Sequence, residues 1–218
     1  MTTNTAASVR ARLTNHAKAS HRPFQEVLQH YGLERLLYRL AQSPHRGGFL
    51  LKGALLLNAW NAPVSRPTRD IDLLGYAEND VAVMETMCRE VCDVVVVDDG
   101  LRFDATTLVG RRIKEDADYQ GVRLTFVAFL EKARIPMQVD IGFGDVVTPE
   151  AEERDYPTLL DLFHAEPAHV SARDGHRRKV RSDGGPGDPE HATCATSSAV
   201  CPTGPSTACS SSPRSTGP

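Results

Sequence analysis

The apolar positions in the first three quarters of the chain follow helical and strand periods in turn. Residues 24–41 repeat large apolar side chains at helical spacing, residues 79–91 do the same, and residues 53–60 are good helix formers. Short apolar runs or apolar–polar alternation predict strands at residues 48–52, 70–74, 94–97, 101–104, 109–113, 122–130 and 135–143. Helices come first and a mixed or mostly antiparallel sheet follows, which predicts an α+β domain over residues 21–162.

The pattern stops near residue 162. Residues 163–218 hold few large apolar side chains and are rich in Pro, Gly and Ser, so they cannot bury enough surface to offset their ordering entropy. We expect a disordered low-complexity tail there and a flexible segment at residues 1–20. The tail holds Cys194, Cys201 and Cys209, but no C-x-x-C pair, so we predict no zinc site. Its composition resembles a GC-rich gene read in a shifted frame, which is a hypothesis that sequencing the locus would test.

The overall charge and hydropathy exclude some classes of protein. The formal net charge of −3 creates no general basic field, so contact with nucleic acid must come from a local cluster of Arg and Lys. No apolar run approaches the ~20 residues that cross a bilayer, and the N-terminus lacks the apolar core of a signal peptide. We therefore expect a cytoplasmic protein without membrane contact. Five cysteines, an odd number, do not favour a disulfide framework.

The candidate chemistry centres on three aspartates. Asp70 and Asp72 are two apart on a predicted strand, so both carboxylates point to one face while Ile71 points to the other. Paired carboxylates repel each other unless a cation lies between them, and Mg²⁺ is a usual occupant. Asp140 interrupts another apolar strand and becomes a third ligand if the two strands pair. The alternative is that the Asp-x-Asp pair decorates a solvent-facing strand edge.

A second candidate group precedes these carboxylates. Lys52 and Gly53 lie at a predicted strand-to-helix turn, where a phosphate can approach main-chain N–H groups and a lysine supplies positive charge. Arg66 and Arg69 flank the aspartates and are candidates for binding a triphosphate. Two plainer interpretations remain: Lys-Gly is common turn chemistry, and the arginines can simply form ion pairs with Asp70 and Asp72.

Four blocks resemble the nucleotidyltransferase-like toxins of the AbiEii/AbiGii family. They are residues 49–57 (FLLKGALLL), 66–74 (RPTRDIDLL), 138–145 (QVDIGFGD) and 156–161 (YPTLLD). The resemblance covers roughly residues 20 to 162. It implies a DNA polymerase β-like nucleotidyltransferase core, with a mixed sheet and helices on one face. It also implies aspartate-bound Mg²⁺ and transfer of nucleotides from a nucleoside triphosphate to an acceptor, which is a tRNA 3′ end in some members. Members typically pair with a cognate antitoxin in phage defence.

The resemblance assigns roles to individual residues. Lys52 and Gly53 match the nucleotide-contacting turn, Asp70 and Asp72 the metal pair, and Asp140 the third carboxylate. After residue 162 the family continues into a helical half with a further lysine and acidic residue, which residues 163–218 do not match. The departure suggests a truncated or frameshifted member. The alternative function is therefore a catalytically silent remnant that binds nucleotide or a partner protein without turnover.

Overall fold

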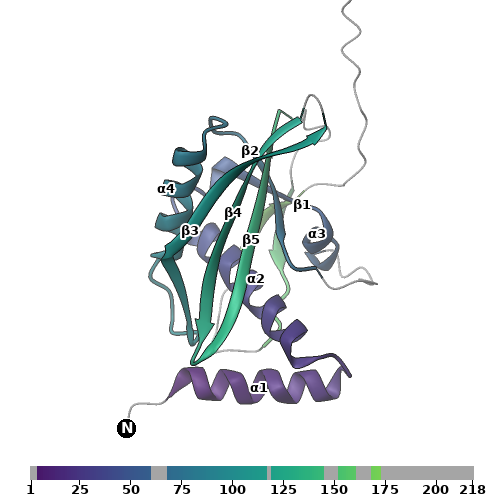
Figure 1. The fold of residues 1–218 in the computed structure, drawn as a ribbon. Coiled ribbons are helices and arrows are strands. Elements are labelled where there is room, and N and C mark those ends of the chain that lie inside the picture. Colours follow the sequence, from purple (N-terminus) through teal and green to yellow (C-terminus); the bar gives the residue numbers. More distant parts are fainter. Residues whose placement is uncertain (1–3, 60–67, 117–118, 145–151, 161–167, 173–218) are drawn as a thin grey trace, which may run out of the picture. The chain divides into compact units, whose positions relative to one another are not determined.

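A single mixed sheet with helices forms the described part of the molecule (Figure 1). The computed structural model describes residues 4–59, 68–116, 119–144, 152–160 and 168–172, and the structural statements below concern these residues. The helices are α1 (Thr5–Ala19), α2 (Phe24–Gln42), the 3₁₀ turn η1 (Arg46–Gly48), α3 (Ala54–Ala59) and α4 (Val81–Cys92). The strands are β1 (Phe49–Lys52), β2 (Ile71–Gly75), β3 (Leu101–Asp116), β4 (Tyr119–Leu130), β5 (Ala133–Phe143), β6 (Glu152–Tyr156) and β7 (Ala168–Ala172).

The sheet has the strand order β3-β4-β5-β2-β1-β7-β6. Consecutive strands β3, β4 and β5 form an antiparallel meander, in which β3 combines the two strands predicted at residues 101–104 and 109–113 across a register shift. The central pair β2 and β5 is parallel, and β1 is antiparallel to β2. Parallel and antiparallel pairs therefore meet in the middle of the sheet, and the predicted mixed α+β core is confirmed.

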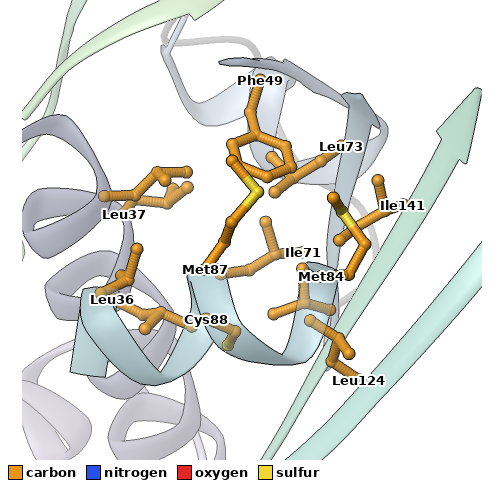
Figure 2. A pocket seen from close by; sticks show the side chains of 13 residues that line it. Leu36, Leu37, Phe49, Ile71, Leu73, Met84, Met87, Cys88, Leu124 and Ile141 are labelled. Atoms are coloured by element: carbon orange, nitrogen blue, oxygen red, sulfur yellow. The ribbon is translucent and has the colours of Figure 1, made fainter. Parts of the chain in front are cut away.

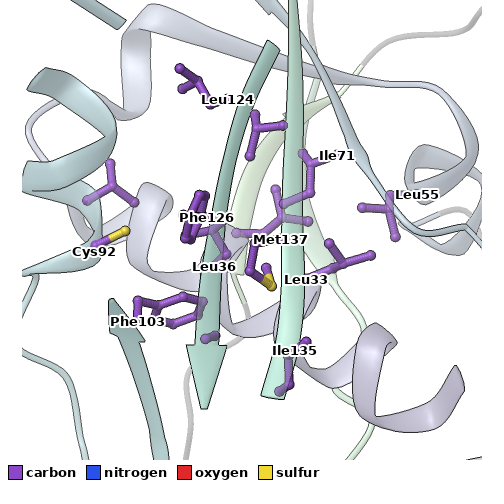
Figure 3. Close-up of a cluster of buried hydrophobic side chains, with 14 of the residues drawn as sticks. Leu33, Leu36, Leu55, Ile71, Cys92, Phe103, Leu124, Phe126, Ile135 and Met137 are labelled. Atoms are coloured by element: carbon purple, nitrogen blue, oxygen red, sulfur yellow. The ribbon is translucent and has the colours of Figure 1, made fainter. Parts of the chain in front are cut away.

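The helices α2 and α4 cover one face of this sheet. α4 packs against β3 and β4, and α2 packs against β5, β7 and α4. Figure 3 shows the shared core, where Leu33 and Leu36 of α2 lie among side chains such as Ile71, Phe126 and Met137 from three strands. Every second residue of the central strands is buried against the helices, as the alternation in the sequence predicted. The residues between them point to the opposite face.

The expectation of a flexible segment at residues 1–20 is wrong for most of its length. Residues Thr5–Ala19 form α1, which is capped by the side chain of Asn4 and packs against α2. Val9 and Leu13 are fully buried and Ala17 is 6% exposed. These three residues recur every four positions, so they form a narrow apolar stripe that polar neighbours conceal in the sequence.

The strand predicted at residues 94–97 is also absent. This segment is an irregular loop in which Val95 is 96% exposed. Arg35 and Arg39 of α2 reach the buried carboxylate of Asp99 with hydrogen bonds of 2.8 and 2.7 Å, and the hydroxyl of Tyr31 donates to its main-chain oxygen. Although burial opposes ionisation, the two guanidinium groups hold the pKa of Asp99 below its usual value. The loop is thus anchored by one side chain instead of by a strand ladder.

Part of the segment expected to be disordered is a strand. β7 (Ala168–Ala172) pairs antiparallel with β6 along its length and meets β1 in parallel at Leu51. Main-chain hydrogen bonds can hold such a strand whatever its polarity, which is why the composition of residues 163–218 did not predict it. Residues 173–218, with the three tail cysteines, lie outside the described residues. None of the helices described is long and apolar enough to span a bilayer.

Candidate metal and nucleotide site

The register of the two central strands brings the three predicted aspartates to one face of the sheet. β2 and β5 run parallel, with Ile71 opposite Val139, Asp72 opposite Asp140 and Leu73 opposite Ile141. The four apolar residues of these pairs are between 1% and 4% exposed, on the face that α2 and α4 cover. Because side chains alternate along a strand, Asp72 and Asp140 point together to the opposite face.

Asp70, Asp72 and Asp140 form a cluster of carboxylates. One ligand oxygen from each lies within 4.8 Å of the other two, with Asp70 and Asp72 half-buried and Asp140 buried. In the sequence, Asp140 was a third ligand only if its strand paired with that of Asp70 and Asp72. This pairing is present, because β5 lies beside β2. Three oxygen donors of this kind suit a hard divalent cation. The cluster is a candidate metal site.

Three polar residues hold the carboxylates in place. Both side-chain oxygens of Asp140 accept hydrogen bonds of 2.8 Å from Arg123 of β4, which forms a bidentate ion pair. Gln138 donates to Asp140 Oδ2 at 3.2 Å and to Asp70 Oδ2 at 3.5 Å, and Thr68 donates to Asp70 Oδ1 at 3.0 Å. These donors offset the repulsion between the acids and fix their rotamers.

Arg123 is the main residue that the sequence interpretation missed. It lies opposite Asp140 on the neighbouring strand, between the buried residues Val122 and Leu124. A charged residue that interrupts an apolar strand was the signal that singled out Asp140, and the same signal was present at Arg123. The sequence alone did not indicate that the two positions are partners.

Lys52 and Gly53 complete the site on its other side. Lys52 lies opposite Asp72 in the antiparallel pair of β1 and β2, so the row across four strands reads Lys52, Asp72, Asp140 and Arg123. Gly53 has a φ of +71°, and a Cβ at this position would overlap the carboxylate of Asp72. The turn needs glycine both for its backbone conformation and for this close approach. Since α3 has only six residues, the positive charge of Lys52 is the stronger feature of the turn.

Of the two arginines that precede the aspartates, only Arg69 lies within the described residues. Arg69 is exposed, and its main-chain oxygen accepts a hydrogen bond of 3.4 Å from Gln29 of α2. Arg66 lies outside the described residues, as does Asp145. The alternative interpretation, ion pairs of Arg69 with Asp70 or Asp72, is not met among the residues that the structure describes. The arginine that pairs with an acid of the cluster is Arg123, on Asp140.

An apolar cavity lies on the other face of the same strands. Figure 2 shows Met84, Met87 and Cys88 of α4 lining it together with Ile71 and Ile141. Its volume is about 30 Å³ and its lining is almost entirely apolar. A nucleotide requires far more space, and apolar cavities of this size stay dry. The cavity belongs to the core, so it does not compete with the carboxylate face as a functional site.

Comparison with known proteins identifies the family. The sequence model of a family described as nucleotidyl transferase AbiEii toxin, type IV TA system, matches residues 35–174. The chain belongs to this family. The match contains every aspartate of the cluster and both residues of the Lys52–Gly53 turn. It begins at residue 35 and extends past residue 162 to include β7, so the family match reaches further along the chain than the resemblance noted in the sequence.

Two further comparisons add little to the AbiEii match. No match was found among the curated proteins. A solved structure, that of JHP933 from Helicobacter pylori, is similar over 64% of this chain and 50% of that chain, with 14% sequence identity and a TM-score of 0.35. At this TM-score the likeness does not demonstrate a shared fold. The chain spans half the length of that protein.

Proposed function

We propose that this chain is a nucleotidyltransferase that transfers a nucleotide from a nucleoside triphosphate to a hydroxyl group of a nucleic acid, with the 3′ end of a tRNA as the candidate acceptor. The observation that carries the proposal is the convergence of Asp70, Asp72 and Asp140 within 4.8 Å, with Lys52 beside Asp72. Membership of the AbiEii family supports the reaction class.

The donor set fits Mg²⁺. All three side chains offer carboxylate oxygens, and their positions on adjacent strands bring ligands from two rigid elements to one point. When bound, Mg²⁺ would neutralise charge on the triphosphate and favour ionisation of the attacking hydroxyl. We assign Asp70, Asp72 and Asp140 as its ligands.

The remaining residues act by charge and by position. Lys52 is half-buried beside Asp72, where an ammonium group can bind the phosphates of the incoming nucleotide. Gly53 lets the turn approach Asp72 closely, so the phosphate-binding residue and the metal ligands form one unit. Gln138 and Thr68 keep Asp70 oriented toward the other carboxylates. Arg66 and Arg69 remain predicted contacts to the nucleotide.

Family membership also suggests the biological setting. A type IV toxin is paired with an antitoxin, so we propose that a cognate antitoxin limits this activity in the cell. The expected location is the cytoplasm, where nucleoside triphosphates and tRNA are found, and the expected role is in phage defence. A test would compare growth and phage infection of cells that express the wild-type chain with those of cells that express Asp70→Asn.

One observation favours a second function, binding without turnover. Arg123 engages both oxygens of Asp140, so the third carboxylate is already paired with a cation. If this pair persists when nucleotide binds, the site retains affinity for a triphosphate but lacks a full set of metal ligands. The chain would then bind nucleotide or a partner protein and transfer nothing.

The proposal is tested by incubating the purified chain with Mg²⁺ and total tRNA. Each labelled nucleoside triphosphate is added in a separate reaction. We expect label to appear in RNA with the wild type and to be lost in Asp70→Asn, whose thermal unfolding should be unchanged because the substitution relieves repulsion and creates no cavity. Protection against heat by nucleotide without transfer would support the second function. Equal transfer by the two proteins, or neither transfer nor protection, would refute the assignment.

A further inference from the structure

A hollow with a mixed polar and apolar lining lies beside the carboxylates and shares Gln138 with them. Its volume is about 370 Å³, within the range of pockets that hold small ligands. The polar and charged residues that line it are Gln29, Arg69, Thr107, Thr125, Arg134 and Gln138. We propose that this Arg69–Arg134 hollow binds the sugar-phosphate backbone at the end of the acceptor nucleic acid. The inference rests on the proposed function, and it gives that function a second substrate site.

The hollow is continuous with the carboxylate cluster. Gln138 lines the hollow and also donates hydrogen bonds to Asp70 and Asp140. Along β5, Arg134, Gln138 and Asp140 are separated by even numbers of residues, so they share one face of the sheet. From Arg134 to Asp140 this face extends about 20 Å, because a strand rises about 3.3 Å per residue. An extended chain bound along it would place its end at the carboxylates.

The charge of the hollow is positive. Arg69 and Arg134 are its charged lining residues, both are exposed, and neither forms an ion pair with a carboxylate in the part of the chain that the structure describes. Arg123 differs, because Asp140 already occupies its guanidinium group. An unpaired guanidinium group in such a hollow is suited to bidentate contact with a phosphate. Phosphate contacts of this kind position a nucleic acid without reading its sequence.

A buried residue fixes the position of Arg69 in the wall. Gln29 of α2 is 7% exposed, and its amide group donates to the main-chain oxygens of Pro136 at 2.8 Å and Arg69 at 3.4 Å. It therefore ties the segment before β2 to the edge of β5. The spacing of Arg69 from the strand that carries Arg134 is set by the core, and does not depend on a mobile surface contact.

The hollow lies apart from Lys52, the predicted contact to the triphosphate. Lys52 lies on β1, beyond Asp72, whereas the hollow is formed mainly by β4 and β5 on the far side of the carboxylates. Phosphoryl transfer requires the attacking and leaving oxygens to lie roughly in line across the reacting phosphorus. Two phosphate-binding regions on opposite sides of a metal site meet this requirement. The proposal thus moves Arg69 from the incoming nucleotide to the acceptor.

Binding measurements without turnover test this assignment. The full chain is titrated into a short 5′-fluorescein-labelled single-stranded RNA, and anisotropy is read at several salt concentrations. We expect Arg134→Gln and Arg69→Gln each to weaken RNA binding about 5- to 10-fold, and each to reduce the slope of log affinity against log salt by about 0.7, the value for one lost contact to a single strand. Arg46→Gln, at an exposed arginine paired with Glu153, is the matched control and should leave both quantities unchanged.

A second titration, with ATP and Mg²⁺, separates the two sources of phosphate. Arg134→Gln should leave the affinity for ATP unchanged, while Lys52→Gln should lower it. Unchanged RNA affinity and salt slope in both hollow variants would overturn the inference. So would a loss of ATP affinity in Arg134→Gln with RNA binding intact, because the hollow would then hold the triphosphate. A wild type that binds RNA through Arg134 but never binds ATP would refute the proposed transferase and leave the hollow as a nucleic-acid site.

Discussion

Around the carboxylates, the two faces of the central sheet differ in polarity although they are built from alternating residues of the same strands. On one face, Leu73 and Ile141 are almost fully buried under α2 and α4; on the other, their neighbours Asp72 and Asp140 carry charge beside Lys52 and Arg123. Strand alternation alone separates the two sets. Residues that stabilise the fold therefore alternate with residues that carry the charge of the site. Substitutions one position apart should accordingly affect either stability or activity.

The largest expected effect is the loss of transfer in Asp72→Asn. We expect the rate of nucleotide incorporation to fall at least ~1000-fold, about 4 kcal/mol of transition-state stabilisation, because the substitution removes a proposed metal ligand. The midpoint of thermal unfolding should stay within a few degrees of the wild type. Asp93→Asn, at an exposed acid that ends α4, is the control and should transfer normally. If Asp72→Asn retained activity, the charged face of the sheet would not be the site of transfer.

On the apolar face, Leu73→Ala should lower the free energy of unfolding by about 2–5 kcal/mol, because it leaves a cavity next to Ile71 and Met84. Urea denaturation followed by circular dichroism measures the change. Leu57→Ala offers a matched control, since Leu57 is 40% exposed and its truncation should cost less than about 1 kcal/mol. Similar losses in the two variants would show that the face under α2 and α4 is less tightly packed than its burial indicates.

A pH titration tests one buried acid, Glu34. Glu34 of α2 is 3% exposed, and no cation among the described residues is bonded to it. Burial raises its pKa to about 7, against the smaller opposing effect of its hydrogen bond from the main-chain N–H of Leu159. Between about pH 4.5 and 7 the native state thus binds a proton that the unfolded state has lost. The free energy of unfolding should fall as pH rises through this range, by up to about 3 kcal/mol.

Glu34→Gln should flatten that part of the stability profile, because glutamine cannot ionise and retains an acceptor for Leu159. Chemical denaturation at a series of pH values provides the measurement. A slope that is equally steep in the variant would mean that other groups carry the pH dependence.

The smallest expected effect concerns Arg123. Replacement by Gln removes a positive charge bonded to Asp140, so we expect the affinity for Mn²⁺, used as a paramagnetic substitute for Mg²⁺, to rise about tenfold, or about 1.4 kcal/mol. Electron paramagnetic resonance of free Mn²⁺ measures it. Arg111→Gln, one strand further from Asp140, should change the affinity less. Weaker binding in Arg123→Gln would show instead that Arg123 is needed to position Asp140.

The alternation of apolar and polar residues was enough to predict the strands of the site and the face of each aspartate. Residues 70–74 and 135–143 both alternate, and the strands found there are β2 (Ile71–Gly75) and β5 (Ala133–Phe143), with Asp72 and Asp140 on one side and Asp70 directly before β2. Alternation does not indicate which strand pairs with which. The parallel pairing of β2 with β5 joins segments that are distant in the chain, and only that pairing makes Asp140 a neighbour of Asp72.

The missed elements share a related cause. α1 shows its apolar stripe only through Val9, Leu13 and Ala17, and its burial depends on α2. β7 is held by main-chain pairing with β6, which leaves no hydrophobic signal. At residues 94–97 the valines favoured a strand, but the ion pairs of Asp99 with α2 hold the segment as a loop. In each case a tertiary contact outweighed the local preference.

The register that aligns Lys52, Asp72, Asp140 and Arg123 also has a consequence for the order in which ligands arrive. With Asp70 included, and among the described residues of this row alone, three carboxylates face the two cations Lys52 and Arg123, so this set carries a net negative charge. One divalent ion reverses the sign of this local field. If the proposed metal and nucleotide sites are correct, a polyanionic nucleotide is repelled from this row before the ion arrives and attracted afterwards, so we expect ordered addition, with the metal before or together with the nucleotide.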